Sequence, residues 1–121
     1  MTNKELVKQF YQDVFVNGKI EKIPEYIVED YIQHNPRVET GREGFIKFFK
    51  NFQSFKPKFE LLNICSEDNM VFLFHKCTFA DGTVNKVCDI FRLENHQIVE
   101  HWDIIESHLE KVKSINNNGI F

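Results

Sequence analysis

Several features that mark common protein classes are missing or scarce in this sequence. No apolar run approaches roughly 18 residues, the minimum for a membrane-spanning helix, and the segment Met1–Glu5 lacks the apolar core of a signal peptide. The net charge is −3, and no cluster of lysine and arginine offers a footprint for nucleic acid. We therefore expect a soluble, cytoplasmic protein with no nucleic-acid partner and no membrane partner.

Cysteine is also scarce, because Cys65, Cys77 and Cys88 are the only three in the chain. Their number is odd, none has the spacing of a metal knuckle, and each falls within a candidate strand. We expect buried, reduced thiols with no disulfide, and no structural metal. Repeats, linkers and low-complexity segments are missing as well, so the sequence is interpreted as a single domain, 1–121.

The first half of the chain has the apolar periodicity of helices. Thr2 and Glu5 have the spacing of a capping box, which predicts a helix that begins near Asn3. A second, shorter helix is expected over 20–27, with Pro24 near its start. The third helix is expected over 45–52, where its many aromatic side chains suit either the core or the lid of a pocket. The apolar face of the first helix is formed by Val7, Phe10, Tyr11, Val14 and Phe15.

The second half of the chain changes to strand patterns separated by short turns. The expected strands are 59–66, 70–79, 84–93 and 98–109, and turns this short imply an antiparallel meander. Phe72–Phe74 is apolar on both faces, so helices should cover one side of the sheet and a second subunit the other. The chain is therefore predicted to be α+β, with N-terminal helices packed on a curved antiparallel sheet, a cone with an apolar pocket, and a homodimer.

The stretch Val99–Ile105 carries the most unusual chemistry. Alternation along a strand puts His101 and Asp103 on one face and Glu100 and Trp102 on the other. A base and a carboxylate beside each other in apolar surroundings must be paired, shifted in pKa, or used in function. The alternative is a pair at the rim of the sheet that faces water.

A hairpin with the preceding strand brings a second carboxyl to the same place. Pairing Leu93 with Val99 sets Phe91 opposite His101 and Asp89 opposite Asp103. The same register places Arg92 beside Glu100 on the other face, as a cross-strand ion pair. Two aspartates in an apolar pocket cannot both ionise freely, so we expect coupled titration, with Asp89 as the protonated member.

Three further candidates come from outside this hairpin. Pro36 keeps Asn35 out of the helical region, so His34 and Asn35 lie at a bend that can aim a polar side chain, although a loop histidine can also be merely exposed. Tyr11 lies on the buried face of the first helix, where it is either a core tyrosine or a substrate contact. The predicted substrate-binding residues are Tyr11, Asn35, Phe49, Phe91 and Trp102.

Four segments together resemble the SnoaL-like polyketide cyclase family of the NTF2-like superfamily: Tyr31–Pro36, Gly41–Phe45, Asp89–Arg92 and Val99–Asp103. The resemblance implies a cone-shaped α+β barrel, frequent homodimers and no obligatory cofactor. In cyclases of this family an aspartate is the general acid/base of an aldol ring closure, and by position it most resembles Asp103.

Ketosteroid isomerase is a more distant relative in the same superfamily. Its oxyanion hole consists of a tyrosine on the first helix and a protonated aspartate, and these two positions look like Tyr11 and Asp89. Where the isomerase has its catalytic aspartate this chain has His34 and Asn35, so the isomerase reaction itself is not carried over.

Three functions remain open on the sequence alone. The first is acid–base chemistry on a small hydrophobic carbonyl compound, with Asp103 moving the proton, His101 or His34 as its partner, and Tyr11 and Asp89 as donors. The second is a pocket that binds a small apolar ligand without turnover. The third, a metal set of His101, Asp103 and His34, is the least favoured, and no metal ligand is predicted.

Overall fold

The computed structural model describes all 121 residues, which form three helices and one five-stranded sheet. The helical segments are α1 (Asn3–Phe10), the π-helical continuation of α1 (Tyr11–Val16), a 3-10 turn (Ile20–Lys22), α2 (Ile23–Tyr26), α3 (Gly41–Gln53) and a second 3-10 turn (Leu109–Lys111). The strands are β1 (Ile27–Gln33), β2 (Lys58–Glu67), β3 (Met70–Thr78), β4 (Val84–Glu94) and β5 (Gln97–Glu106).

The first helix begins where the capping box predicts. The Thr2 hydroxyl oxygen accepts a hydrogen bond from the backbone N–H of Glu5 at 3.1 Å, so Thr2 is the N-cap of α1. The helical segment after it is shorter than predicted, since it ends at Tyr26 and the chain is extended from Ile27. The last strand also ends early, at Glu106, instead of continuing to residue 109.

The sheet confirms the α+β prediction but is mixed and open. Its strand order is β1-β5-β4-β3-β2, and β2 to β5 form the predicted antiparallel meander. β1 pairs in parallel with β5. Parallel partners are distant in sequence and are joined by no short turn, so the turn pattern could not reveal this pairing. β1 and β2 are the two edges of the sheet.

Turn chemistry explains how the meander is held in register. Asn95 and His96 connect β4 to β5, and both have positive φ, 49° and 61°. A two-residue turn with φ positive at both positions matches the right-handed twist of the flanking strands. Asn adopts this conformation more readily than most residues. The β4–β5 hairpin, which carries the candidate site, is therefore closed by a locally favoured turn.

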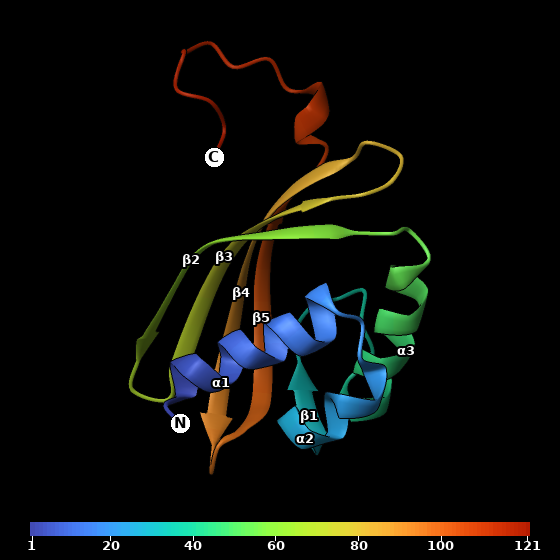
Figure 1. Cartoon of the computed structure of the whole chain (residues 1–121), viewed down its shortest axis with the longest axis vertical. Coiled ribbons are helices and arrows are strands. Elements are labelled where there is room, and N and C mark those ends of the chain that lie inside the picture. The colour runs from blue at the N-terminus through green and yellow to red at the C-terminus, as the bar shows by residue number, and fades with distance from the viewer.

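The helices cover one face of the sheet, here called the inner face. α1 lies across β2 and β3, α3 lies beside β1, and the long strands curve around them (Figure 1). In β3 and β4 every second side chain points into this layer, which gives the alternating burial of Val71 and Leu73 and of Phe91 and Leu93. Together with residues from the helices and β1, they form a core of 16 buried hydrophobic residues.

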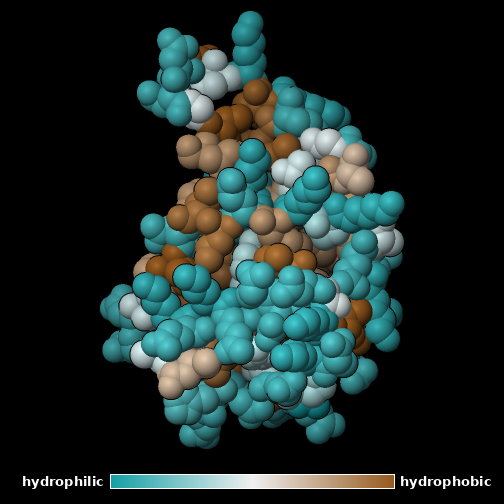
Figure 2. All heavy atoms as spheres, in the orientation of Figure 1, coloured by the Kyte–Doolittle hydropathy of each residue, from teal (hydrophilic) through white to brown (hydrophobic).

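The opposite, outer face of the sheet is bare. Its central residues are hydrophobic and only half-buried: Phe72, Phe74, Cys88, Ile90 and Trp102. Seen from the side of the helices, hydrophobic atoms are visible between the helical end and the C-terminal segment, and hydrophilic atoms cover the helical end (Figure 2). No helix is long and apolar enough to span a bilayer.

The remaining features of the fold are the C-terminal segment and the three cysteines. The C-terminal segment loops away from the sheet (Figure 1) and returns, so that the Phe121 ring lies 5.0 Å from Nζ of Lys76 and 5.5 Å from Nζ of Lys86. All three cysteines are free, as predicted. Cys77 is the only one that is fully buried, and Cys65 is exposed, which corrects the expectation that all three are buried.

Candidate functional site

The hairpin of β4 and β5 places two carboxyl groups opposite each other on the inner face. Asp89 pairs with Asp103, and Phe91 pairs with His101, as the sequence predicts. The predicted pairing of Leu93 with Val99 is wrong by one residue, because the register shifts after Arg92 and Leu93 pairs with Ile98. The irregularity lies on the turn side of the site, so the faces of the site residues are unchanged.

Asp89 is buried and accepts hydrogen bonds from two imidazoles. His101 Nε2 lies 2.8 Å from Asp89 Oδ1, and His75 Nε2 lies 2.7 Å from Asp89 Oδ2. Burial alone would raise the pKa of Asp89, but the hydrogen bonds of the two histidines and the charge of His101 outweigh it and hold the pKa far below its usual range. Asp89 is thus ionised, and the expectation that it is the protonated aspartate is wrong.

His101 is fixed from both sides. Its Nδ1 lies 2.7 Å from Gln33 Oε1, which also accepts the backbone N–H groups of His34 and Asn35, each at 3.0 Å. Those two backbone donors identify the Gln33 atom as an oxygen, so Nδ1 of His101 must carry a proton. Its Nε2 donates to the ionised Asp89. His101 therefore carries a proton on both nitrogens and forms a buried ion pair with Asp89.

Asp103 has a different environment from Asp89, although the two are paired across the hairpin. Asn35 Nδ2 donates to both of its oxygens, at 3.1 Å to Oδ1 and 2.8 Å to Oδ2. Burial raises the pKa of Asp103, the nearby charge of Asp89 adds to the rise, and Asn35 and His101 only partly oppose it. The carboxyl group with the raised pKa in this site is thus Asp103.

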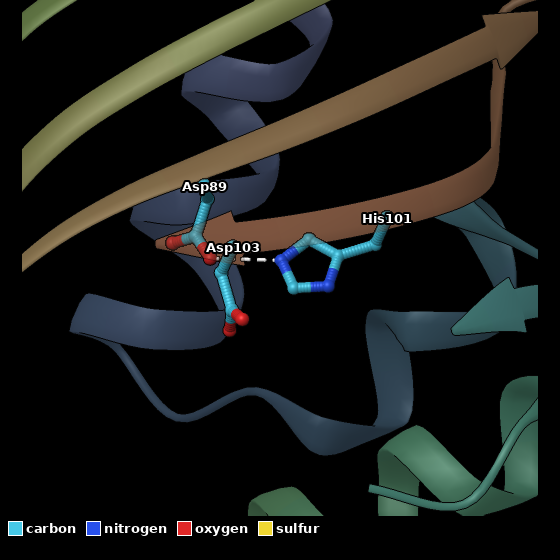
Figure 3. A group of neighbouring side chains, drawn as sticks. All are labelled: Asp89, His101 and Asp103. Atoms are coloured by element: carbon cyan, nitrogen blue, oxygen red, sulfur yellow. Dashed lines mark hydrogen bonds and ion pairs between the residues drawn. The ribbon is translucent and has the colours of Figure 1, made fainter. Parts of the chain in front are cut away.

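These groups border a cavity with a volume of about 90 Å³ on the inner face. Eleven of its 18 lining residues are hydrophobic, many of them phenylalanine. The polar groups gather on the wall formed by β3, β4, β5 and the end of β1, where Figure 3 shows Asp89, His101 and Asp103 converging. Five of the predicted site residues line the cavity: Asn35, Asp89, Phe91, His101 and Asp103.

Two predicted residues belong to the outer face instead. The rings of His34 and Trp102 stack with centroids 4.7 Å apart, and His34 Nε2 lies 2.7 Å from Glu100 Oε2. Neither His34 nor Trp102 lines the cavity. His34 therefore cannot serve as the partner of Asp103, because the sheet separates them.

Two other predicted residues lie in the core behind the cavity. Phe49 is fully buried among aromatic rings and does not line the cavity. The Tyr11 ring packs edge-on against His75, with centroids 5.4 Å apart. Its buried hydroxyl has no hydrogen-bond partner, and burial raises the pKa of this phenol. Tyr11 thus supports His75 from behind.

Sequence reasoning missed His75 and Gln33, although each left a signal. His75 is the polar member of the alternating buried set Val71, Leu73, His75 and Cys77 in β3, and that placement marks a histidine that needs a buried partner. Gln33 directly precedes His34 and Asn35, the two candidate residues at the bend, and it pairs with His101 in the parallel ladder of β1 and β5. Only that unforeseen pairing brings it to the site.

The atoms needed for metal binding are close together but already engaged. One ligand-type atom from each of Asp89, His101 and Asp103 lies within 4.8 Å of the others (Figure 3). Asp89 and His101 bind each other, and Asp103 binds Asn35. The metal set considered from the sequence, which included His34, is not brought together, since His34 lies on the outer face.

Comparison with known protein families places most of the chain in one match. The model of the SnoaL-like domain matches residues 7–101, well over half of the sequence. No curated protein matches the sequence significantly.

Solved structures agree on the fold. IdmH from Streptomyces antibioticus, a candidate polyketide cyclase, has a TM-score of 0.70 and 19% identity, over 88% of this chain and 93% of that one. A candidate ketosteroid isomerase from Kribbella flavida has a TM-score of 0.77 and 12% identity, over 96% and 91%. An NTF2-like protein of unknown function from Mesorhizobium loti has a TM-score of 0.74 and 20% identity, over 86% and 90%. At such low identity the likeness shows a shared NTF2-like fold.

Proposed function

The chain belongs to the SnoaL-like domain family, and on that premise we propose that it is an acid–base enzyme acting on a small hydrophobic carbonyl compound. The reaction is of the aldol or enolisation type, in which a proton leaves the carbon next to the carbonyl group. The observation that carries the proposal is the placement of Asp103, a carboxyl held by Asn35 on both oxygens at the wall of a largely apolar cavity.

Asp103 is proposed as the group that takes and returns the proton. A general base is most effective when its pKa approaches the working pH, and the pKa of Asp103 is shifted in that direction by burial and by Asp89. Asn35 positions the carboxylate, because its amide donates to both oxygens. Asn35 is itself held, since its side-chain oxygen accepts the backbone N–H of Arg37 at 2.9 Å.

His101 is proposed to stabilise the negative charge that develops on the substrate oxygen. Both of its ring nitrogens are engaged, with Gln33 and Asp89, so it acts through its positive charge and not as a free donor. The pair of donors expected from the sequence, Tyr11 and a protonated Asp89, is not retained. Asp89 is ionised, and Tyr11 does not line the cavity.

The cavity restricts the size of the substrate. A volume of about 90 Å³ is several times the roughly 10–15 Å³ that one enclosed water requires on the same measure. It therefore suits a compact ring or a short chain. Large polycyclic compounds would require the phenylalanine side chains to move.

The test is exchange of the α-hydrogens of cyclopentanone in deuterated buffer, followed by NMR. Wild-type protein should accelerate the exchange, and Asp103→Asn should reduce the acceleration by at least about 100-fold, the lower end for loss of a general base. Glu100→Gln is the matched control, because it changes a neighbouring β5 carboxylate on the outer face. Equal exchange by wild type and Asp103→Asn, with both folded by circular dichroism, would refute the role of Asp103.

A second function is favoured by one observation. The polar groups of Gln33, His101, Asp89 and His75 bind one another and would rigidify the wall of a pocket that only holds its ligand. In that case cyclopentanone should bind, as judged by calorimetry, without any acceleration of exchange.

The outer face of the sheet supports a further element of the proposal, a homodimer. Phe72, Phe74 and Ile90 form the centre of a bare hydrophobic surface with charged residues such as Lys86 and Glu106 toward its edge. A monomer rarely exposes a surface of this kind, and a two-fold dimer would cover it with the same surface of a second copy.

A further inference from the structure

Two buried acceptor atoms beside the cavity have no hydrogen-bond partner in the protein. They are His75 Nδ1 and Asn85 Oδ1, and both residues line the cavity. Buried polar atoms in native proteins are nearly always paired, so an unpaired one at a cavity wall indicates a ligand or solvent partner. The candidate base Asp103 is a separate group, because its two oxygens are held by Asn35.

The ladder between β3 and β4 places these two residues near each other. Asn85 is opposite Cys77, and His75 is opposite Val87, so His75 and Asn85 are diagonal neighbours on the inner face. Diagonal neighbours are about 7–8 Å apart, within reach of one ligand. Along β4, Asn85 is four residues from Asp89, about 13 Å at the rise of a strand. The His75–Asn85 pair thus extends the polar wall of the cavity from Asp89, which His75 contacts, toward the start of β4.

The protonation of His75 decides what the His75–Asn85 pair can recognise. Nε2 of His75 faces the ionised Asp89, so Nε2 carries a proton. A second proton, on Nδ1, would leave a charged, buried N–H without a partner in the protein, which is strongly unfavourable. His75 is therefore neutral, with its proton on Nε2 where it donates to Asp89, and its Nδ1 is a bare acceptor.

We propose that the cavity binds a compound carrying a hydroxyl group, whose O–H donates to one of the two unpaired acceptors, His75 Nδ1 or Asn85 Oδ1, while the reacting carbon lies by Asp103. A hydroxyl supplies a donor for either acceptor, whereas a second carbonyl could only accept from the side-chain N–H₂ of Asn85 and would leave His75 Nδ1 unpaired. The substrate class is then a small hydroxylated carbonyl compound instead of a simple ketone. The inference rests on the proposed function only in taking this cavity as the ligand site.

The experiment compares phenol with toluene, which differ by a hydroxyl in place of a methyl group. Calorimetry gives the ratio of their affinities for wild type, for Asn85→Leu and for Asn85→Asp. The ratio of the phenol affinity to the toluene affinity should be roughly five- to tenfold higher in wild type than in Asn85→Leu, because this is the usual net effect of one hydrogen bond. Asn85→Asp keeps an acceptor oxygen and should keep the preference. Cys77→Val, opposite Asn85 on the same wall, is the control that should leave the ratio unchanged.

A nitrogen-15 NMR spectrum of the His75 ring gives a second readout that needs no variant. The free protein should show a protonated Nε2 and an unprotonated Nδ1, and phenol but not toluene should shift the Nδ1 signal. The proposal is overturned if Nδ1 is protonated in the free protein, if neither probe binds at millimolar concentration, or if Asn85→Leu leaves the ratio unchanged and phenol does not shift the Nδ1 signal. Asn85→Ala replaces Asn85→Leu should the latter not fold. None of these readouts requires turnover, so a failed α-hydrogen exchange would refute only the proposed reaction.

Discussion

Two histidine–carboxylate pairs of nearly equal length lie on opposite faces of the β4–β5 hairpin. On the inner face His101 Nε2 lies 2.8 Å from Asp89, and on the outer face His34 Nε2 lies 2.7 Å from Glu100. The side chains of the inner pair are 9% and 8% exposed, whereas those of His34 and Glu100 are 41% and 15% exposed. The distances are alike, so the difference between the two pairs lies in their access to water.

Burial changes what each pair requires from its neighbours. The inner pair is surrounded by protein, and His75 and Gln33 supply the hydrogen bonds that water would otherwise supply. In the outer pair, Arg92 donates a hydrogen bond to Glu100, and the Trp102 ring stacks on His34. The hydrogen bonds from His34 and Arg92 hold the pKa of Glu100 below its usual range. The same two residue types thus form an obligatory network on one face and a solvated contact on the other.

The largest expected effect comes from removing the inner carboxylate. Asp89→Asn should lower the free energy of unfolding by about 3–5 kcal/mol, because it leaves the charged His101 buried without its counter-charge. Urea unfolding followed by circular dichroism measures the loss. The matched outer change, Glu100→Gln, should lower the same quantity by about 1 kcal/mol or less. Equal losses in the two variants would show that burial does not distinguish the pairs.

This prediction reverses the one that the sequence alone supports. With Asp89 as a protonated donor, an asparagine at 89 would be a mild substitution. With Asp89 accepting from His75 and His101, the amide N–H₂ of asparagine faces donors, so the substitution is severe. The protonation state depended on His75, which lies 14 residues earlier in the chain and was not assigned to the site.

The second prediction concerns the outer face as a whole and tests the proposed homodimer. Wild-type protein should have the mass of a dimer in light scattering at micromolar concentration, and Ile90→Lys should weaken association by roughly 100-fold, since it buries an unpaired charge at the centre of the contact. Ile115→Lys is the control, because Ile115 is fully exposed in the C-terminal segment. A monomeric wild type would refute the dimer.

Much of the site was readable from the sequence because strand alternation is a local rule. Alternation placed His101 and Asp103 together, and the Arg92–Glu100 ion pair selected the correct side-chain faces despite the shift at Leu93. The capping box located α1 for the same reason, since it involves only residues three apart. Local patterns therefore sufficed for most of the elements, although not for strand β1, and for one hairpin of the site.

The missing parts all depend on contacts that are distant in sequence. Gln33 reaches His101 only because β1 pairs in parallel with β5, and no short turn in the sequence indicates that pairing. His34 was expected beside Asp103, but the neighbouring residues Gln33 and Asn35 turn inward at the bend and leave it on the outer face. Which aspartate has the raised pKa followed from these distant contacts, and no local pattern encodes them.

The third prediction uses pH to compare the two aspartates. Asp89 has a lowered pKa when folded, so the stability it contributes is present above the usual Asp pKa of 3.8 and is lost as the pH falls below it. Asp103 has a raised pKa, so the folded state loses stability through it as the pH rises from 3.8 through the raised value. Asp103→Asn should therefore gain stability relative to wild type over that upper window.

The measurement is the free energy of unfolding of wild type and Asp103→Asn at a series of pH values from 3 to 8, by urea titration. The difference between the two proteins should move in favour of the variant as the pH rises. A difference that is constant with pH would mean that the folded protein does not shift the pKa of Asp103. Asp103 is less deeply buried than Asp89, so this effect should be smaller than the loss in Asp89→Asn.

The smallest effect, and the sharpest test of the comparison between the faces, is the response to salt. At an ionic strength of about 1 M the Debye length is about 3 Å, so charges open to water are screened while buried charges are not. The small loss in Glu100→Gln should therefore vanish between about 0.05 M and 1 M sodium chloride, whereas the loss in Asp89→Asn should stay the same. The measurement is best made in an Ile90→Lys background, because a dimer would shield the outer face from the salt. If both losses respond equally to salt, the two pairs share one dielectric environment, and the inner network cannot give Asp89 and Asp103 the different pKa values that the proposed chemistry uses.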